Sequence, residues 1–195
     1  MTLAVFGTML SYMTVSSFTP GPGNLLALNN TTQYGFSKSK KLLLGICCGY
    51  CCVQILCTVA VYCLNSYISP VLSVLKYIGA AYVCWMAIRM MLSKPATEET
   101  TKTPTFLAGF LLQLVNVKIY FYIISLLTTY LIPNIASLPL LFLAGAGVVA
   151  VGCSATFLWA FCGTKLQTFY RRYFRWINLV LGAFLLYCAW SIIRS

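Results

Sequence analysis

The sequence predicts an all-α integral membrane protein with six transmembrane helices, arranged as two inverted three-helix repeats. Three observations carry this prediction: an apolar composition, six apolar runs of spanning length, and an alternation of basic and uncharged connections. Of the 195 residues, 61% are hydrophobic and only 8% are charged. A soluble domain carries about 25% charged residues, so this chain is expected to pack in a lipid bilayer.

Six runs reach the length of about 20 mostly apolar residues that a spanning helix needs. We expect them near Leu3–Thr32, Leu42–Leu64, Pro70–Leu92, Thr105–Ile132, Leu138–Gly163 and Trp176–Ile193. The first and fourth runs are long enough to tilt or to be broken. We expect a single exporter domain over 1–195, with halves of about 1–92 and 105–195 joined by a cytoplasmic loop at 93–104.

The connections between these runs alternate in charge. Three of them hold ten basic residues: Lys38, Lys40, Lys41, Arg89, Lys94, Lys102, Lys165, Arg171, Arg172 and Arg175. Basic loops stay in the cytoplasm, so both termini are predicted to be periplasmic, with Arg194 at the opposite face. The net charge of +11 is therefore explained by orientation in the membrane, and no nucleic-acid partner is expected.

A short internal repeat supports two related halves. Tyr82–Arg89 and Tyr187–Arg194 both read Tyr-x-x-Trp-x-x-x-Arg, at an offset of 105 residues. Two unrelated helix ends in the aromatic belt would give a similar pattern. Three helices per half make the halves enter the membrane from opposite sides, as in the inverted repeats of many secondary transporters.

The first run contains a stretch that should interrupt its helix, Pro20, Gly21, Pro22, Gly23 and Asn24. Proline removes a backbone donor and clashes with the preceding turn, while glycine allows backbone angles that other residues resist. Irregular backbone at this depth must be buried in protein or line a wet cavity. The start of the second half-helix offers backbone amides and a positive dipole end to a substrate carboxylate. The alternative is a structural kink that lets helices pack.

Three polar residues lie in the fourth run: Gln113, Asn116 and Lys118. A lysine near the bilayer centre costs at least ~3 kcal/mol on insertion scales, so Lys118 should face the bundle interior. It would pair there with backbone carbonyls or with an anionic group of the substrate. The alternative is that Lys118 snorkels to the interface.

The remaining apolar runs hold cysteines and glycines. Cys47 and Cys51 lie one helical turn apart and could hold a soft metal, but no histidine or aspartate supports this, and buried thiols are the simpler reading. Small-residue faces favour close packing of helices within the protomer or between protomers of a homo-oligomer; they comprise Gly45, Gly49, Gly145, Gly147 and Gly152. We find no nucleophile elbow and no P-loop, so neither an enzyme nor a bound cofactor is expected.

Two motifs bear a family resemblance. The stretch Thr19–Asn24, with Gly35–Phe36 and Gly45–Gly49 after it, resembles the first-helix signature of the LysE/RhtB superfamily of amino-acid exporters. Asn116 and Lys118 resemble the second motif of that superfamily, which is usually Asn-Pro-Lys. Val117 stands where proline is usual, which weakens the case for a second helix break.

The resemblance, which covers the whole chain, implies a function. It implies a secondary-active exporter of small amino acids in the bacterial inner membrane, with cysteine and O-acetylserine as substrates and protons as the coupling ion. Lys118 is the one obvious intramembrane group to carry such a proton. The alternatives are an exporter of homoserine and threonine or of neutral amino acids more broadly, a passive channel, and a membrane scaffold that transports nothing.

Overall fold

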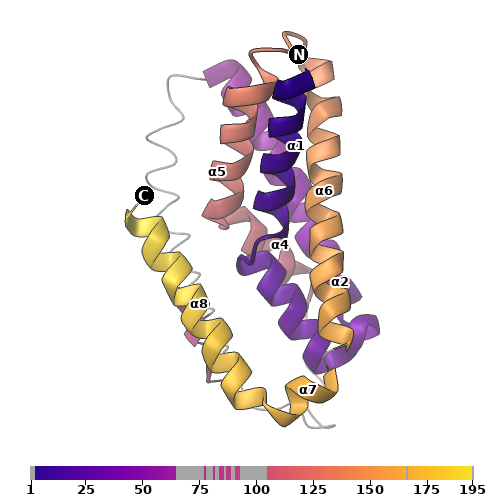
Figure 1. Cartoon of the computed structure of the whole chain (residues 1–195), viewed down its shortest axis with the longest axis vertical. Helices are drawn as coiled ribbons and strands as arrows, with labels where there is room; N and C mark the ends of the chain where they lie inside the picture. Colours follow the sequence, from indigo (N-terminus) through magenta and orange to yellow (C-terminus); the bar gives the residue numbers. More distant parts are fainter. Residues whose placement is uncertain are drawn as a thin grey trace.

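The structure, a computed structural model, describes residues 3–64, 77, 81, 84–85, 87–88, 91–92, 105–165 and 167–194, which form helices joined by short breaks and turns. The helices shown in Figure 1 are α1 (Leu3–Phe18), α2 (Pro22–Leu64), α4 (Phe106–Leu114), α5 (Val117–Leu126), the π-helix η2 (Leu127–Leu131), α6 (Leu138–Lys165), α7 (Gln167–Arg172) and α8 (Phe174–Arg194). Most of the expected third span, Pro70–Leu92, lies outside the described residues.

Two of the described helices are long and apolar enough to cross a membrane, over Pro22–Cys63 and Leu138–Lys165. Helix α4 and the segment Val117–Leu131 meet this criterion together, as one span bent by 56°. Helix α1 has 16 residues and is too short alone. It becomes a full span only when the first limb of α2 continues it past the break.

Helix α2 contains a reversal of direction at Gly35, whose φ of 78° and ψ of 164° are not helical. Asn24 and Thr31 lie beside Thr156 and Gly163, so the first limb runs parallel to α6. The second limb runs antiparallel to α6, as expected for a chain that turns at its lower end and runs back up (Figure 1). The prediction of a loop between Thr32 and Leu42 is therefore wrong, because the helix resumes directly after Gly35.

The core forms where α6 and α4 pack against α2. A Cβ atom at Gly49 would lie 2.7 Å from Cβ of Gln113, and one at Gly145 would lie 3.0 Å from Nε2 of Gln54. Gly45 and Gly152 are also in close contact with neighbouring helices, which confirms close packing at these four glycines. Gly147 makes no such contact within the protomer, because no atom of the described chain lies within 4 Å of the Cβ position there.

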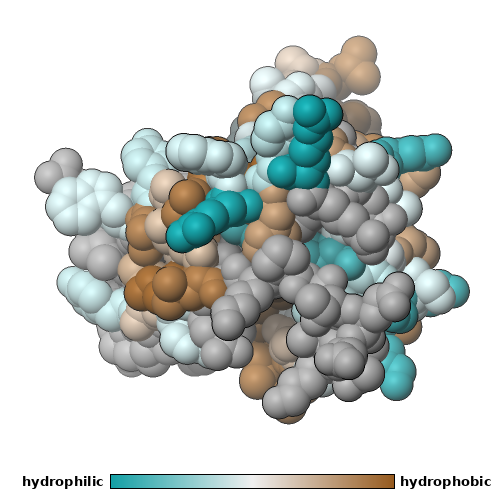
Figure 2. Space-filling view, turned by 90° about the horizontal axis from the view of Figure 1, so that it is seen from below, coloured by the Kyte–Doolittle hydropathy of each residue, from teal (hydrophilic) through white to brown (hydrophobic). Residues whose placement is uncertain are grey.

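The lower end of the molecule carries the exposed basic side chains (Figure 2). The exposed lysines and arginines at the turn of α2 and around α7 are Lys38, Lys40, Lys41, Lys165, Arg172 and Arg175. Helix α8 begins two residues before the predicted Trp176 and packs back onto α2, where Asn29 donates a hydrogen bond to Asn178 at 2.8 Å.

Candidate functional site

The break between α1 and α2 consists of Thr19, Pro20 and Gly21, with Pro22 in the first turn of α2. The predicted interruption is present, and the predicted second half-helix begins at Pro22. Proline suits this first position because the N–H that it lacks would have no partner inside the helix. The C-terminal end of α1 and the N-terminal end of α2 therefore face each other inside the protein.

The carbonyl groups at the end of α1 are bound by side chains from three helices. Asn24 donates from Nδ2 to the carbonyl oxygens of Ser17, at 2.9 Å, and Thr19, at 3.1 Å. Trp159 of α6 donates from Nε1 to the carbonyl oxygen of Phe18 at 3.1 Å. These contacts pair carbonyl groups that have no partner inside the helix. Unpaired carbonyl groups would be costly at membrane depth.

Lys118 of α5 provides the remaining contacts to this end of α1. Its ammonium group donates to the carbonyl oxygen of Thr19 at 3.2 Å, to the hydroxyl of Thr19 at 3.0 Å, and to the carbonyl oxygen of Pro20 at 3.4 Å. A positive charge is stabilised at the negative end of a helix dipole. Lys118 therefore binds backbone carbonyls, one of the two pairings predicted from the sequence, and it does not snorkel away from the bundle.

The N-terminal end of α2 differs from the end of α1. The N–H groups of Gly23 and Asn24 lie in the first turn, where no intrahelical acceptor exists. A Cβ atom at Gly23 would lie 3.0 Å from Oε1 of Gln113, so the glycine keeps this turn open to α4. The carbonyl groups at the break are thus occupied, while the N–H groups in the first turn of α2 have no acceptor within their helix.

A second break separates α4 from α5, although Val117 replaces the expected proline. Asn116 has a φ of −80° and a ψ of 88°, and the axes of the two segments meet at 56°. Its side chain donates from Nδ2 to Oε1 of Gln113 at 3.0 Å. The bend is present without a proline, so the expectation that Val117 weakens the case for a second break was wrong.

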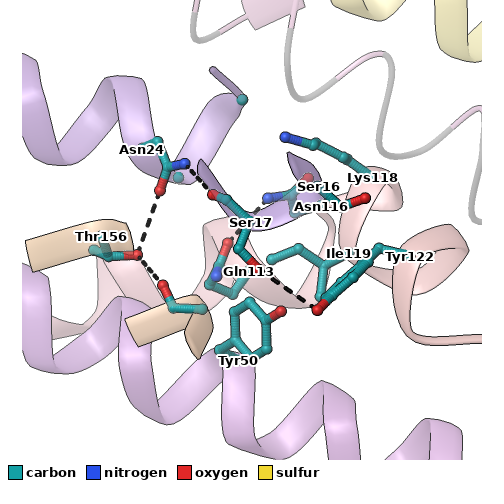
Figure 3. Close-up of a pocket in the computed structure, with 13 residues that line it drawn as sticks. Ser16, Ser17, Asn24, Tyr50, Gln113, Asn116, Lys118, Ile119, Tyr122 and Thr156 are labelled. Atoms are coloured by element: carbon teal, nitrogen blue, oxygen red, sulfur yellow. Dashed lines mark hydrogen bonds between the residues drawn. The ribbon is translucent and has the colours of Figure 1, made fainter. Parts of the chain in front are cut away.

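The two breaks enclose one cavity (Figure 3). Six predicted site residues line it: Gly21, Gly23, Asn24, Gln113, Asn116 and Lys118. Pro20 and Pro22 are not among the lining residues and act through the backbone. The free volume of about 40 Å³ is enough for a few water molecules. An amino acid enters only if the side chains or helices around the cavity move.

Other lining residues were not predicted, and they come from α1, α2, α5 and α6: Ser16, Ser17, Tyr50, Ile119, Tyr122, Gly152 and Thr156. Asn24, Ser17 and Thr156 lie along one side, and Tyr50 and Tyr122 lie next to each other along another (Figure 3). Polar residues inside apolar spans are a signal for a site. Tyrosine and threonine are a weak signal for a site, because both are also common in ordinary spanning helices.

The chemistry of the cavity suits a small zwitterion. Among the described lining residues, the one charged side chain is that of Lys118, and none is a carboxylate. The hydroxyl of Tyr50 and Oδ1 of Asn116 are buried and have no hydrogen-bond partner in the described part of the chain. The cavity is therefore lined by one cation, by the first turn of α2 and by neutral acceptors.

A metal site finds no support in this geometry. Within the described ranges, no three side chains of histidine, cysteine, aspartate or glutamate come together in a way that could hold a metal ion. Cys47 and Cys51 are both free thiols on α2, but Cys47 is only half-buried and Cys51 is exposed, so the expectation of buried thiols was wrong for Cys51.

Comparisons with known proteins agree with these features. The family model described as LysE type translocator matches residues 14–195. Proteins named cysteine/O-acetylserine efflux protein are similar over nearly the full length. The protein from Klebsiella pneumoniae subsp. pneumoniae is 34% identical over 194 residues, covering 99% of both chains. Those from Escherichia coli O157:H7 and Salmonella typhi are 34% and 33% identical, each covering 97% of both chains. No solved structure matches.

Proposed function

Because this chain belongs to the LysE type translocator family, we propose that it exports cysteine and O-acetylserine by secondary-active transport. As a family member it is an amino-acid exporter of the inner membrane and not an enzyme. The two substrates are those in the names of its relatives. Both are small, uncharged in the side chain and zwitterionic, which suits a cavity lined by one cation and no described carboxylate.

The proposal rests on a difference between the two helix ends at the first break: the carbonyl groups of α1 are hydrogen-bonded, while the first N–H groups of α2 have no acceptor in their helix. The carbonyl groups of Ser17, Phe18, Thr19 and Pro20 accept hydrogen bonds from side chains. The N–H groups of Gly23 and Asn24 have no acceptor within their helix. A group that enters the cavity at this point is met by donors at a positive dipole end, so the substrate carboxylate binds there.

Lys118 acts as the charged partner of this carboxylate. Its Nζ lies 3.0 Å from the position of a Cβ atom at Gly21, directly before the first turn of α2. A carboxylate at Gly23 and Asn24 lies beside this ammonium group and draws it from the carbonyl groups of Thr19 and Pro20. Gln113 and Asn116 position the substrate from the second break.

Two interrupted spans that run in opposite directions support alternating access as the mechanism of this export. The first break lies in the first span of its half, and the second break lies in the first span of the other half, as the inverted-repeat plan requires. Rocking of the halves then exposes the cavity to each side in turn. The basic lower end faces the cytoplasm and both termini face the periplasm, as the positive-inside rule favours. Inward proton movement drives export, with Lys118 as the candidate proton carrier.

Transport into inverted membrane vesicles tests this function. We expect saturable uptake of labelled cysteine and O-acetylserine, faster with a proton gradient than without one. Preferred uptake of threonine would favour the homoserine and threonine alternative, and uptake that does not saturate would favour a channel. Preferred uptake of lysine would contradict a cavity whose one described charged side chain is cationic.

A further inference from the structure

Three buried oxygen atoms have no hydrogen-bond partner among the described residues: Oδ1 of Asn116, the hydroxyl of Tyr50 and Oε1 of Gln54. Their side chains are between 2% and 5% exposed. All three can accept hydrogen bonds, and an unpartnered buried acceptor is costly. Three such atoms in one region indicate a ligand that supplies donors.

Two of these oxygens lie at the cavity and the third lies beyond it on α2, and we call the three the acceptor row. Asn116 and Tyr50 line the cavity, and Gln54 follows Tyr50 by one helical turn on α2, about 6 Å toward Leu64. Gln54 donates from Nε2 to the hydroxyl of Thr58 at 3.1 Å, and this hydroxyl donates to the carbonyl oxygen of Gln54 at 2.8 Å. Thr58 thus occupies the donor end of the amide and leaves the acceptor end unpaired.

Glycines of α6 face this row. A Cβ atom at Gly152 would lie 2.9 Å from the hydroxyl oxygen of Tyr50, and one at Gly145 would lie 3.0 Å from Nε2 of Gln54. At both levels the side chains of Tyr50 and Gln54 pack directly against the backbone of α6, so a ligand reaches Gln54 only when the two helices separate. Beyond Thr58 the wall becomes apolar with the buried Val61 and Leu141, so the row ends before the end of the helix.

We propose that Gln54, with Thr58 and Gly145, forms a second binding position for the substrate. On the outward route, the α-ammonium group of the substrate moves from Asn116 and Tyr50 to this position. An ammonium group carries three donors and no acceptor, which matches a row of unpaired acceptor oxygens. This inference rests on the proposed function and on the orientation that places Leu64 at the periplasmic side. Substrate binds first at the cavity and then pauses at Gln54 before release.

Separating binding from turnover tests this proposal. Gln54→Met removes the acceptor and keeps the side-chain length, and Gln54→Glu keeps acceptor oxygens. We expect Gln54→Met to bind labelled cysteine within about twofold of wild type by equilibrium dialysis, while vesicle turnover falls about tenfold, the cost of one lost bond to a charged group. Gln54→Glu should retain at least about half of the turnover. Ile55→Met, at the same depth but exposed, is the matched control.

Unchanged turnover in Gln54→Met would overturn the proposal, as would a parallel loss of binding and turnover. If that variant does not fold, Gly145→Ala tests the proposal instead, because its methyl group crowds Nε2 of Gln54. Gly147→Ala is its control, because its methyl group meets no atom within 4 Å. We expect about fivefold slower turnover in Gly145→Ala alone; equal turnover in both would contradict the proposal. Absence of cysteine binding and transport in the wild type would instead contradict the proposed function.

Discussion

The ammonium group of Lys118 lies 3.2 Å from the carbonyl oxygen of Thr19, a residue 99 positions earlier in the chain. This contact joins the two interrupted spans at the point where each one breaks. It places the one charged side chain among the described cavity residues at the end of α1 and beside the start of α2. A substrate carboxylate that binds at α2 must therefore compete with the carbonyl groups of Thr19 and Pro20 for the ammonium group of Lys118. Substrate binding thus weakens a contact that holds the two spans together.

Replacing Lys118 with methionine should abolish most export. The variant keeps the length of the side chain but loses the charge and three hydrogen bonds. We expect export of labelled cysteine to fall by about 10- to 100-fold, the range for hydrogen bonds to a charged group. Lys118→Arg retains the charge and should retain part of the activity. Wild-type export by the methionine variant would remove Lys118 from the mechanism.

Gly21→Ala should impair substrate binding through Lys118. The added methyl group would lie 3.0 Å from both Cδ and Nζ of Lys118, so the lysine must shift away from the first turn of α2. We expect KM for cysteine to rise at least about fivefold in vesicles. Gly7→Ala in α1 is the control, because no atom lies within 4 Å of its Cβ position. Equal KM values for both variants would contradict a role for this contact.

Trp159→Phe should destabilise the protein because it leaves the carbonyl group of Phe18 without its donor. A buried acceptor that loses its partner costs about 1–3 kcal/mol. The thermal unfolding midpoint in detergent should fall accordingly. Trp176→Phe is the control, since Trp176 is 72% exposed. If both variants unfold at the wild-type midpoint, the carbonyl group of Phe18 does not need Trp159.

Tyr50→Phe should separate stability from function. The hydroxyl of Tyr50 lies next to Tyr122 but makes no hydrogen bond of good geometry within the described residues, so its removal should change the unfolding midpoint little (Figure 3). Export should nevertheless fall several-fold, because the substrate loses an acceptor in the cavity. Tyr62→Phe on the exposed face of α2 should change neither property. A clear loss of stability in Tyr50→Phe would show that the hydroxyl is structural.

The sequence predicted the first break well because proline and glycine act locally. Pro20 and Gly21 interrupt a helix whatever surrounds them, and Pro22 begins the next helix. Gln113, Asn116 and Lys118 could also be selected from the sequence, since polar groups at membrane depth must find partners inside the protein.

Other features depended on packing and could not be predicted. The second break occurs at Asn116, whose side chain contacts Gln113, without the proline that would have signalled it. The turn at Gly35 needs one residue instead of a loop, because a positive φ reverses the chain at once. Tyr50 and Thr156 reach the cavity because Gly152 lets α2 and α6 approach closely, which only the three-dimensional arrangement reveals.

Competition by cysteine analogues tests the carboxylate site at the broken helix most directly. Uptake of labelled O-acetylserine into inverted vesicles should be blocked by unlabelled cysteine. Cysteamine and cysteine methyl ester, which lack the carboxylate, should compete at least about tenfold more weakly, since a charged hydrogen bond is lost. Equal competition by cysteine and cysteamine would contradict the carboxylate site, because it would mean that the N–H groups of Gly23 and Asn24 hold no carboxylate.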